Sequence, residues 1–293
     1  MVGKGESSSK GGKKSDLLAV NGAYGTFSGI YLCKDKILSY LIDFTGNVLE
    51  RETEDLPELS ADRISEAVVE KITADRKRYS NHRGVGITVQ SAVNKRGGIV
   101  VSPGFDIEIP GFKDFLKKEV GDIPIVVEND ANCSAYYCFN QYKGRYRHLL
   151  AFLVYFDPFS MGVGIISDRK LLRGTSGGAG EIWRPKDNIM EKYLHRYDHD
   201  LNRVLHAADL DVLLTGLRRY ILSAWMFLDT QLMILCGDLS SLPKEYLDMM
   251  IESMQRECKG INIVFEERND LSILGAAQLS TELYLNRSLA KIA

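Results

Sequence analysis

The sequence has few cysteines and lacks the spacings with which cysteines bind metal or build a disulfide framework. Its five cysteines in 293 residues lie inside apolar stretches and include no C-x-x-C pair. An odd total also fits a disulfide framework poorly. Long apolar runs are missing too: the longest, residues 149–156, is too short to cross a bilayer, and no apolar signal segment opens the chain. We therefore expect a cytoplasmic protein in a reducing compartment.

An excess of charge of one sign is absent as well. The sequence carries 37 Lys and Arg against 39 Asp and Glu, a formal net charge of −2. The body as a whole therefore offers no electrostatic attraction to nucleic acid or to anionic membranes. The composition is 45% hydrophobic and 26% charged, as in ordinary globular proteins. The length is enough for two domains of roughly 150 residues each.

The first half of the chain reads as a strand-rich segment followed by alternating helices and strands. Residues 1–15 are mostly Gly, Ser and Lys, so we expect them to be flexible, with structure beginning at Leu17. Ser60 is expected to cap a helix, because apolar positions recur at helical spacing over residues 64–72. The expected strands and helices cover 26–32, 36–44, 47–56, a helix from Ser60, 84–89, 98–102, a helix over 111–119, 124–128 and a helix over 131–142.

The second half repeats this order. Expected elements are strands at 149–156 and 162–167, a hairpin into 170–174, a helical region over 186–228, strand 231–237, helix 244–258, strand 261–267 and a last helix from Leu271. Two similar α/β halves imply a cleft between lobes, where such proteins bind small molecules. We divide the chain into a linker (1–15), an N-terminal lobe (16–146), a C-terminal lobe (147–280) and a helix (281–293) that returns to the N-terminal lobe.

Four segments in the same order and spacing resemble the ROK family of sugar kinases and sugar-responsive repressors. They are residues 85–105, PIVVENDANCSAYY at 124–137, LLRGTSGGAGEI at 171–182 and DLSILGAAQL at 270–279. The resemblance covers about Leu17 to the C-terminus. It implies a two-lobed actin-like ATPase (ribonuclease H-like) α/β fold with duplicated βββαβα lobes.

The polar cluster after strand 124–128 is the first candidate site. Asn129 and Asp130 fall at the carboxyl edge of a sheet, where α/β proteins present side chains to ligands. From the residues alone, both could simply cap the following helix. The resemblance favours a sugar pocket, and in the family's kinases the residue at the position of Asp130 is the general base.

The resemblance adds further ligand-binding candidates. The glycine-rich turn that includes Gly178 would bring backbone close to the cleft, and Glu181 after it would contact the sugar. Arg184 stands where the family has a histidine, and Gly104 where it often has asparagine. Arg184 would favour a ligand with a phosphate or carboxylate group.

The segments that would bind a nucleotide depart from the family pattern. A polyphosphate needs backbone N–H donors presented by glycines. The D-x-G-G-T motif falls on residues 31–35, where Tyr31, Cys33 and Asp35 replace the metal-side aspartate and later motif positions. The G-T-G turn falls on Pro158 to Ser160, where proline has no N–H group to donate.

The third nucleotide motif and the family's zinc loop are altered as well. Gly237 and Asp238 stand where the family has a glycine pair. No cysteine lies between Glu181 and Cys236, so the cysteine-rich zinc loop is missing. His195, His199 and His206 fit a solvated helix face better than a replacement metal site. We expect no cofactor and no metal.

The N-terminal residues bear on the function. Residues 3–21 resemble the junction at which the wing of a winged helix-turn-helix runs into the effector domain of ROK repressors. We therefore expect the sugar-sensing, dimerising module of a ROK repressor, which phosphorylates nothing, senses a sugar or sugar derivative, and contacts operator DNA only through a domain not in this sequence. The alternatives are a ROK sugar kinase with unorthodox loops and a scaffold without a ligand.

Overall fold

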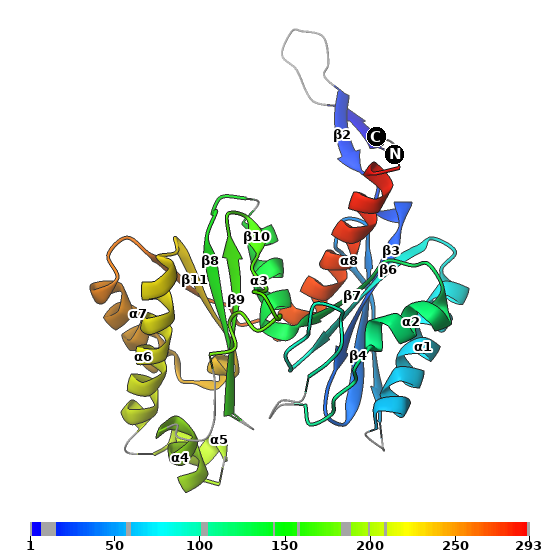
Figure 1. Cartoon of the computed structure of the whole chain (residues 1–293). Coiled ribbons are helices and arrows are strands. Elements are labelled where there is room, and N and C mark those ends of the chain that lie inside the picture. Colours follow the sequence, from blue (N-terminus) through cyan, green and yellow to red (C-terminus); the bar gives the residue numbers. More distant parts are fainter. Residues whose placement is uncertain are drawn as a thin grey trace, which may run out of the picture.

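Two five-stranded sheets form two lobes, and two helices lie between them (Figure 1). The computed structural model describes residues 2–6, 16–56, 60–100, 105–142, 144–156, 159–182, 189–198, 200–207 and 210–291. The first lobe contains β3 (Thr26–Leu32), β4 (Lys36–Asp43), β5 (Val48–Asp55), α1 (Ala61–Arg78), β6 (His82–Val89), α2 (Phe112–Val120) and β7 (Ile125–Asn129). Helix α3 (Asp130–Gln141) leads into the second lobe.

The second lobe has the same strand topology as the first. Its elements are β8 (Leu149–Phe156), β9 (Phe159–Ser167), β10 (Lys170–Leu171), α4 (Ile189–Arg196), α5 (Leu201–Leu205), α6 (Leu210–Leu228), β11 (Leu232–Gly237), α7 (Lys244–Glu257), β12 (Asn262–Phe265) and α8 (Leu271–Leu289). The strand orders are β5-β4-β3-β6-β7 and β10-β9-β8-β11-β12. Each sheet joins an antiparallel meander to two parallel strands.

Strand β8 shows how one sheet separates two cores. Leu150, Phe152 and Val154 pack in the cluster that includes α6 and α7 on the outer face. Leu149, Ala151 and Leu153 alternate with them and pack in the cluster that includes α3 and the start of α8. Because side chains alternate along a strand, a continuous apolar run such as LLAFLVYF marks a strand buried on both faces.

The two central helices approach the sheets and each other at backbone distance. A Cβ atom added at Gly275 of α8 would lie 1.9 Å from the carbonyl oxygen of Cys133 in α3. A Cβ atom at Gly86 of β6 would lie 1.8 Å from the carbonyl oxygen of Ala276. Helix α8 therefore packs on the first sheet from its beginning at Leu271, ten residues before the expected return at residue 281.

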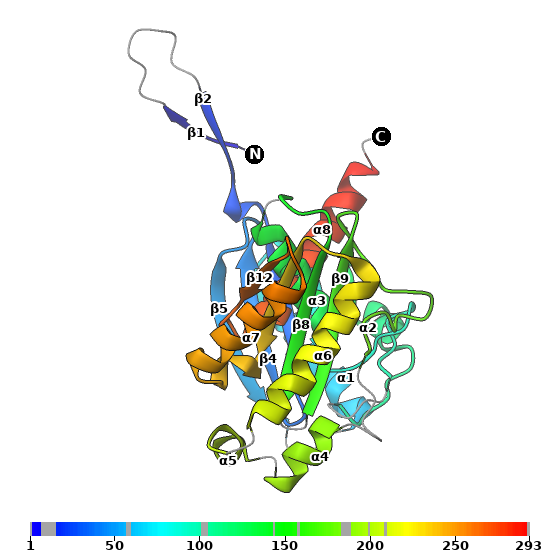
Figure 2. The ribbon, with the colours of Figure 1, turned by 90° about the vertical axis from the view of Figure 1, so that its left-hand side faces the viewer.

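The chain forms a β-hairpin before the first lobe. Strand β1 (Val2–Glu6) pairs antiparallel with β2 (Asp16–Val20), and Figure 2 shows the pair projecting from the body. This corrects the expectation that structure begins at Leu17. Strand pairing uses backbone groups, which a count of apolar side chains does not reveal.

Most of the expected elements are present, with two further differences. Within 98–102, Ile99 forms only isolated bridges, to Val93 and Ile109, and residues from 101 lie outside the described part. The expected helical region over 186–228 is divided into α4, α5 and α6. Ser60 caps α1 as expected, because its hydroxyl accepts the N–H of Arg63 at 3.2 Å. None of the described helices is both long and apolar enough to cross a membrane.

The glycine contact predicts the effect of a single methyl group. Gly86→Ala should lower the free energy of unfolding by about 2 kcal/mol or more, because overpacking an interior costs about 1–3 kcal/mol. Gly178→Ala is the matched control, since its Cβ atom would come no closer than 3.7 Å to the Ser176 hydroxyl. Urea unfolding measures both variants, and equal midpoints would contradict the close packing.

Candidate functional site

The carboxyl end of β7 carries three consecutive buried polar side chains, Glu128, Asn129 and Asp130. They lie where β7 gives way to α3 (Figure 1), between the lobes. Asn129 is the N-cap residue of α3, and its Oδ1 accepts the N–H of Asn132 at 3.1 Å. The capping role that the residues alone allowed is therefore correct for Asn129.

The amide group of Asn129 faces the cleft while its oxygen caps the helix. Its Nδ2 donates to the carbonyl oxygen of Ser91 at 3.1 Å and to Oε1 of Glu181 at 3.3 Å. Glu181 is exposed to solvent, and partial desolvation raises the pKa of its carboxyl group. The structure thus brings together two of the residues that the sequence singled out.

Asp130 is a buried carboxyl group with an altered proton affinity. Burial raises its pKa to about 7, because a low-dielectric interior disfavours the charged form. Oδ1 accepts the N–H of Ala131 at 2.8 Å, and Oδ2 accepts the hydroxyl of Tyr155 at 2.9 Å. Both hydrogen bonds lower the pKa of Asp130, whereas the nearby charge of Glu181 raises it.

Tyr155 connects Asp130 to the opposite lobe. Its hydroxyl oxygen lies 3.1 Å from that of Tyr31. Tyr31 belongs to β3 of the first lobe and Tyr155 to β8 of the second. Burial raises the pKa of both phenols well above the usual value, so both stay neutral. We call Asp130, Tyr155 and Tyr31, joined by these two hydrogen bonds, the tyrosine bridge.

A second hydrogen bond also joins the lobes. Nε2 of Gln90, which follows β6, donates to the hydroxyl oxygen of Ser160 in β9 at 2.8 Å. Phe159 beside it is buried and stacks on Phe156, with ring centroids 6.1 Å apart. Side chains therefore fill the turn that aligns with the family's second nucleotide motif.

The turn at residues 33–35 is closed by its own backbone. The N–H of Cys33 donates to the carbonyl oxygen of Lys36 at 3.0 Å, and the carbonyl oxygen of Asp35 accepts the N–H of Leu56 at 2.7 Å. Burial raises the pKa of the Cys33 thiol to about 11. The N–H of Cys33 is thus already used within the protein.

The third altered motif contributes an acceptor where a phosphate-binding loop would need donors. Oδ2 of Asp238 accepts the N–H of Phe156 at 2.9 Å. Gly237 has a φ of +85°, and a Cβ atom there would lie 2.3 Å from the carbonyl oxygen of Val154. Close packing on β8 is therefore sufficient to explain this glycine.

The glycine-rich turn that precedes Glu181 is fixed against both lobes. A Cβ atom at Gly177, with φ +91°, would lie 2.1 Å from the carbonyl oxygen of Val93 in the first lobe. One at Gly180, with φ +89°, would lie 1.8 Å from that of Val163 in the second. Gly178 between them is exposed. The turn thus holds Glu181 beside Asn129.

Sequence reasoning missed an ion pair behind this cluster. Oε2 of Glu128 accepts Nε of Arg173, which follows β10, while Oε1 accepts the N–H of Asn129 at 3.0 Å and Nδ2 of Asn132 at 2.9 Å. Both oxygens of this buried carboxylate are therefore occupied. The R-G motif at 173–174 was a usable signal for Arg173, as the lone tyrosine in a strand of apolar residues was for Tyr155.

Three predicted site residues, Gly104, Pro158 and Arg184, lie outside the described residues. His199 does too, while His195 and His206 are exposed. Within the described ranges, no group of three or more His, Cys, Asp or Glu side chains could hold a metal ion.

Comparisons with known proteins agree on a family and on a fold. The family model described as "ROK family" matches residues 27–183, which is more than half of the chain. The "Xylose repressor" of Staphylococcus xylosus is 29% identical over 184 residues, covering 62% of this chain and 47% of the relative. The chain thus matches about half the length of this curated relative.

Two solved structures share the fold. One, titled "Crystal structure of the ROK family transcriptional regulator, homolog of E.coli MLC protein", has a TM-score of 0.75 at 17% identity and covers 94% of this chain and 83% of its own. The ROK hexokinase from Thermus thermophilus has a TM-score of 0.72 at 18% identity and covers 89% of this chain and 99% of its own. The expected two-lobed actin-like ATPase fold is confirmed.

The raised pKa of Asp130 predicts a pH dependence. The folded-state pKa of about 7 lies above the unfolded value of about 3.9, so the stability that Asp130 contributes is complete below pH ~4 and is lost as the pH rises through ~7. Asp130→Asn should therefore gain stability relative to the wild type over this window, by at most about 1.4 kcal/mol per pH unit.

Urea unfolding at several pH values between 4 and 8 measures this difference. Asp114→Asn is the control, because the side chain of Asp114 is 68% exposed. A pH-independent difference between Asp130→Asn and the wild type would contradict the proton affinity assigned here to Asp130.

Proposed function

The chain belongs to the ROK family, and from that premise we propose that it is the sugar-sensing module of a transcriptional regulator that does not phosphorylate its ligand. The observation that carries the proposal is the tyrosine bridge. Tyr31 aligns with the metal-side aspartate of the family's first nucleotide motif, and its hydroxyl is bonded to that of Tyr155. A neutral phenol cannot bind a magnesium ion as a carboxylate does.

The neighbouring loops support the same proposal. Polyphosphate recognition on this fold needs free backbone N–H groups. Here the N–H of Phe156 is taken by Asp238 and that of Cys33 by the Lys36 carbonyl oxygen. A nucleotide would have to break these bonds and would meet the charge of Asp238, which is unfavourable without a bridging cation.

The sugar in this proposal binds where Asn129, Asp130 and Glu181 converge. Asp130 is only 3% exposed, so a sugar hydroxyl reaches it only by replacing the Tyr155 hydroxyl on Oδ2. That exchange preserves the number of hydrogen bonds to the carboxylate and releases the link between the lobes. Sugar binding would thus shift the balance between two lobe arrangements, and Arg184 would select a ligand with an anionic group.

The β-hairpin supports a regulator over an enzyme. Strands β1 and β2 project from the body, and a two-stranded sheet by itself is marginally stable in water. Such a hairpin fits the wing of a winged helix-turn-helix, as its resemblance implied. The xylose repressor relative is consistent with this role. In the proposal, two cytoplasmic subunits pair, and operator DNA is bound by a domain not among the elements of this sequence.

A kinase is the second candidate, and Asp130 is the observation that favours it. A pKa of about 7 suits a general base at neutral pH, and the ROK hexokinase shares the fold. The two candidates differ in nucleotide binding, so both are tested on the same protein.

A sugar should raise the melting temperature, whereas ATP with magnesium should not. Saturation at a hundred times the dissociation constant stabilises a protein by about 2.7 kcal/mol. D-Xylose, D-glucose and their phosphates are the first ligands to test by thermal shift. Asp130→Asn and Glu181→Gln should lose the response, whereas Asp114→Asn should keep it. A shift with ATP and none with any sugar would sink the sensor proposal.

ADP formation decides between the candidates directly. The sensor should form no ADP above a protein-free blank when a sugar that gave a thermal shift is present with ATP and magnesium. The kinase candidate predicts sugar-dependent ADP formation that Asp130→Asn reduces by a factor of roughly 100 or more, as expected for loss of a general base. A coupled spectrophotometric assay measures it.

A further inference from the structure

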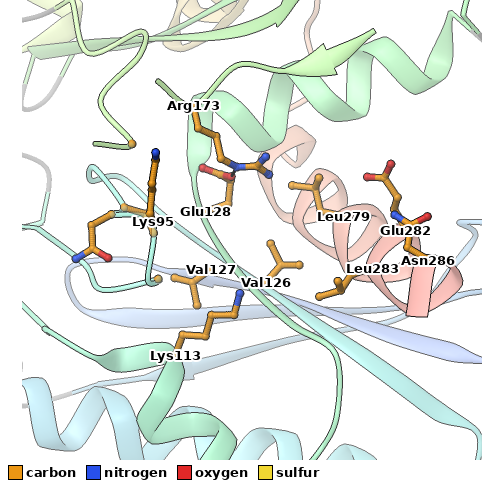
Figure 3. A pocket seen from close by; sticks show the side chains of 14 residues that line it. Lys95, Lys113, Val126, Val127, Glu128, Arg173, Leu279, Glu282, Leu283 and Asn286 are labelled. Atoms are coloured by element: carbon orange, nitrogen blue, oxygen red, sulfur yellow. Dashed lines mark hydrogen bonds and ion pairs between the residues drawn. The ribbon is translucent and has the colours of Figure 1, made fainter. Parts of the chain in front are cut away.

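A cavity of about 270 Å³ lies behind the candidate site, on the other side of Glu128 (Figure 3). One wall is the edge strand β7, and another is the inner side of α8. The loop before α2 and the first turn of α2 close it from the first lobe, and Arg173 and Gly177 close it from the second. None of Asn129, Asp130 and Glu181 lines it. It is therefore a separate site at the lobe junction.

The lining of this cavity is apolar on one side. Val126 of β7 and Leu279 and Leu283 of α8 face the same space (Figure 3). The volume corresponds to roughly nine water molecules at about 30 Å³ each. An apolar surface of this kind favours an occupant with a carbon skeleton over water alone.

Cationic side chains dominate the rest of the lining. Lys95, Lys113 and Arg173 all reach the cavity (Figure 3). Arg173 is paired with Glu128, whose two oxygens are both occupied. Lys95 and Lys113 form no ion pair with any of the described residues. Two positive charges therefore remain without a counter-charge on this part of the protein.

The other acidic side chain of the lining is engaged elsewhere. Oε2 of Glu282 accepts the hydroxyl of Tyr136 at 2.9 Å, outside the cavity. Lys113 is half-buried, and desolvation lowers the pKa of its ammonium group, helped by the charges of Lys117 and Arg173. A half-buried ammonium group gains from an anionic partner, because desolvated charges are costly unless paired.

We propose that this cavity binds a small organic anion, a carboxylate or phosphate ester whose apolar body is about the size of one ring. The anionic group lies against Lys113, with Lys95 and Asn286 at the rim, and the apolar body lies against Val126, Leu279 and Leu283. The site is independent of the proposed sugar sensing. Because Arg173 and Gly177 belong to the second lobe, the ligand contacts both lobes.

Phenyl phosphate and benzoate test the proposal by isothermal titration calorimetry on the full chain. Both should bind saturably with one molecule per chain. Benzyl alcohol, which keeps the ring and lacks the charge, should bind at least tenfold more weakly, and so should inorganic phosphate, which lacks the ring. Lys113→Met should weaken phenyl phosphate about tenfold, which is about 1.4 kcal/mol, whereas Lys113→Arg should retain binding.

Lys117→Met is the matched control. Lys117 lies on the same helix, is 44% exposed and faces Asp114 at 3.8 Å, away from the cavity. Equal weakening by Lys117→Met and Lys113→Met would show a general effect of net charge and overturn the proposal. So would unchanged affinity in Lys113→Met, or no saturable binding of either anion.

A measurement on the wild type locates the site without any variant. Methyl NMR signals of Leu279 and Leu283 should shift on addition of phenyl phosphate, with the same dissociation constant as in calorimetry. Shifts confined to Leu residues outside the cavity, such as Leu239, would refute the assignment. This readout holds even if a variant at residue 113 fails to fold.

Discussion

The hydrogen bond between Tyr155 and Asp130 is the interaction on which the functional account depends. Through Tyr31 it joins the first and second lobes at the carboxyl edge of both sheets. The Tyr155 hydroxyl occupies an acceptor position of Asp130, so the buried carboxyl group has a partner inside the protein. The same side chains stand in the space where kinases of this fold would hold the phosphates, so one arrangement keeps Asp130 ready for a hydroxyl ligand and opposes nucleotide binding.

The geometry of this bridge rests on the two central helices. Helix α3 begins at Asp130, and α8 crosses it at backbone distance through Gly275. Since α8 also touches the first sheet at Gly86, a movement of one lobe is transmitted to the start of α3 through packed backbone. The glycine-rich turn fixes Glu181 in the same way, because Gly177 and Gly180 each meet a carbonyl oxygen of a different lobe.

Local patterns predicted most elements and part of the site. The alternation of β8, the Ser60 cap and the polar cluster after β7 were readable because each depends on neighbouring residues. The tyrosine bridge was not, since Tyr31 and Tyr155 are 124 positions apart and meet only once the lobes are assembled. Strand β1 was missed because backbone pairing leaves little trace in a segment of Gly, Ser and Lys.

A crystal structure grown with a bound sugar and saturating ATP and magnesium tests the central claim most directly. The account predicts sugar density against Asn129, Asp130 and Glu181, with no nucleotide between the lobes and Tyr31 still filling the phosphate position. A magnesium-bound triphosphate in contact with residues 31–35 and the Phe159–Ser160 turn, with Tyr31 and Tyr155 moved apart, would contradict it.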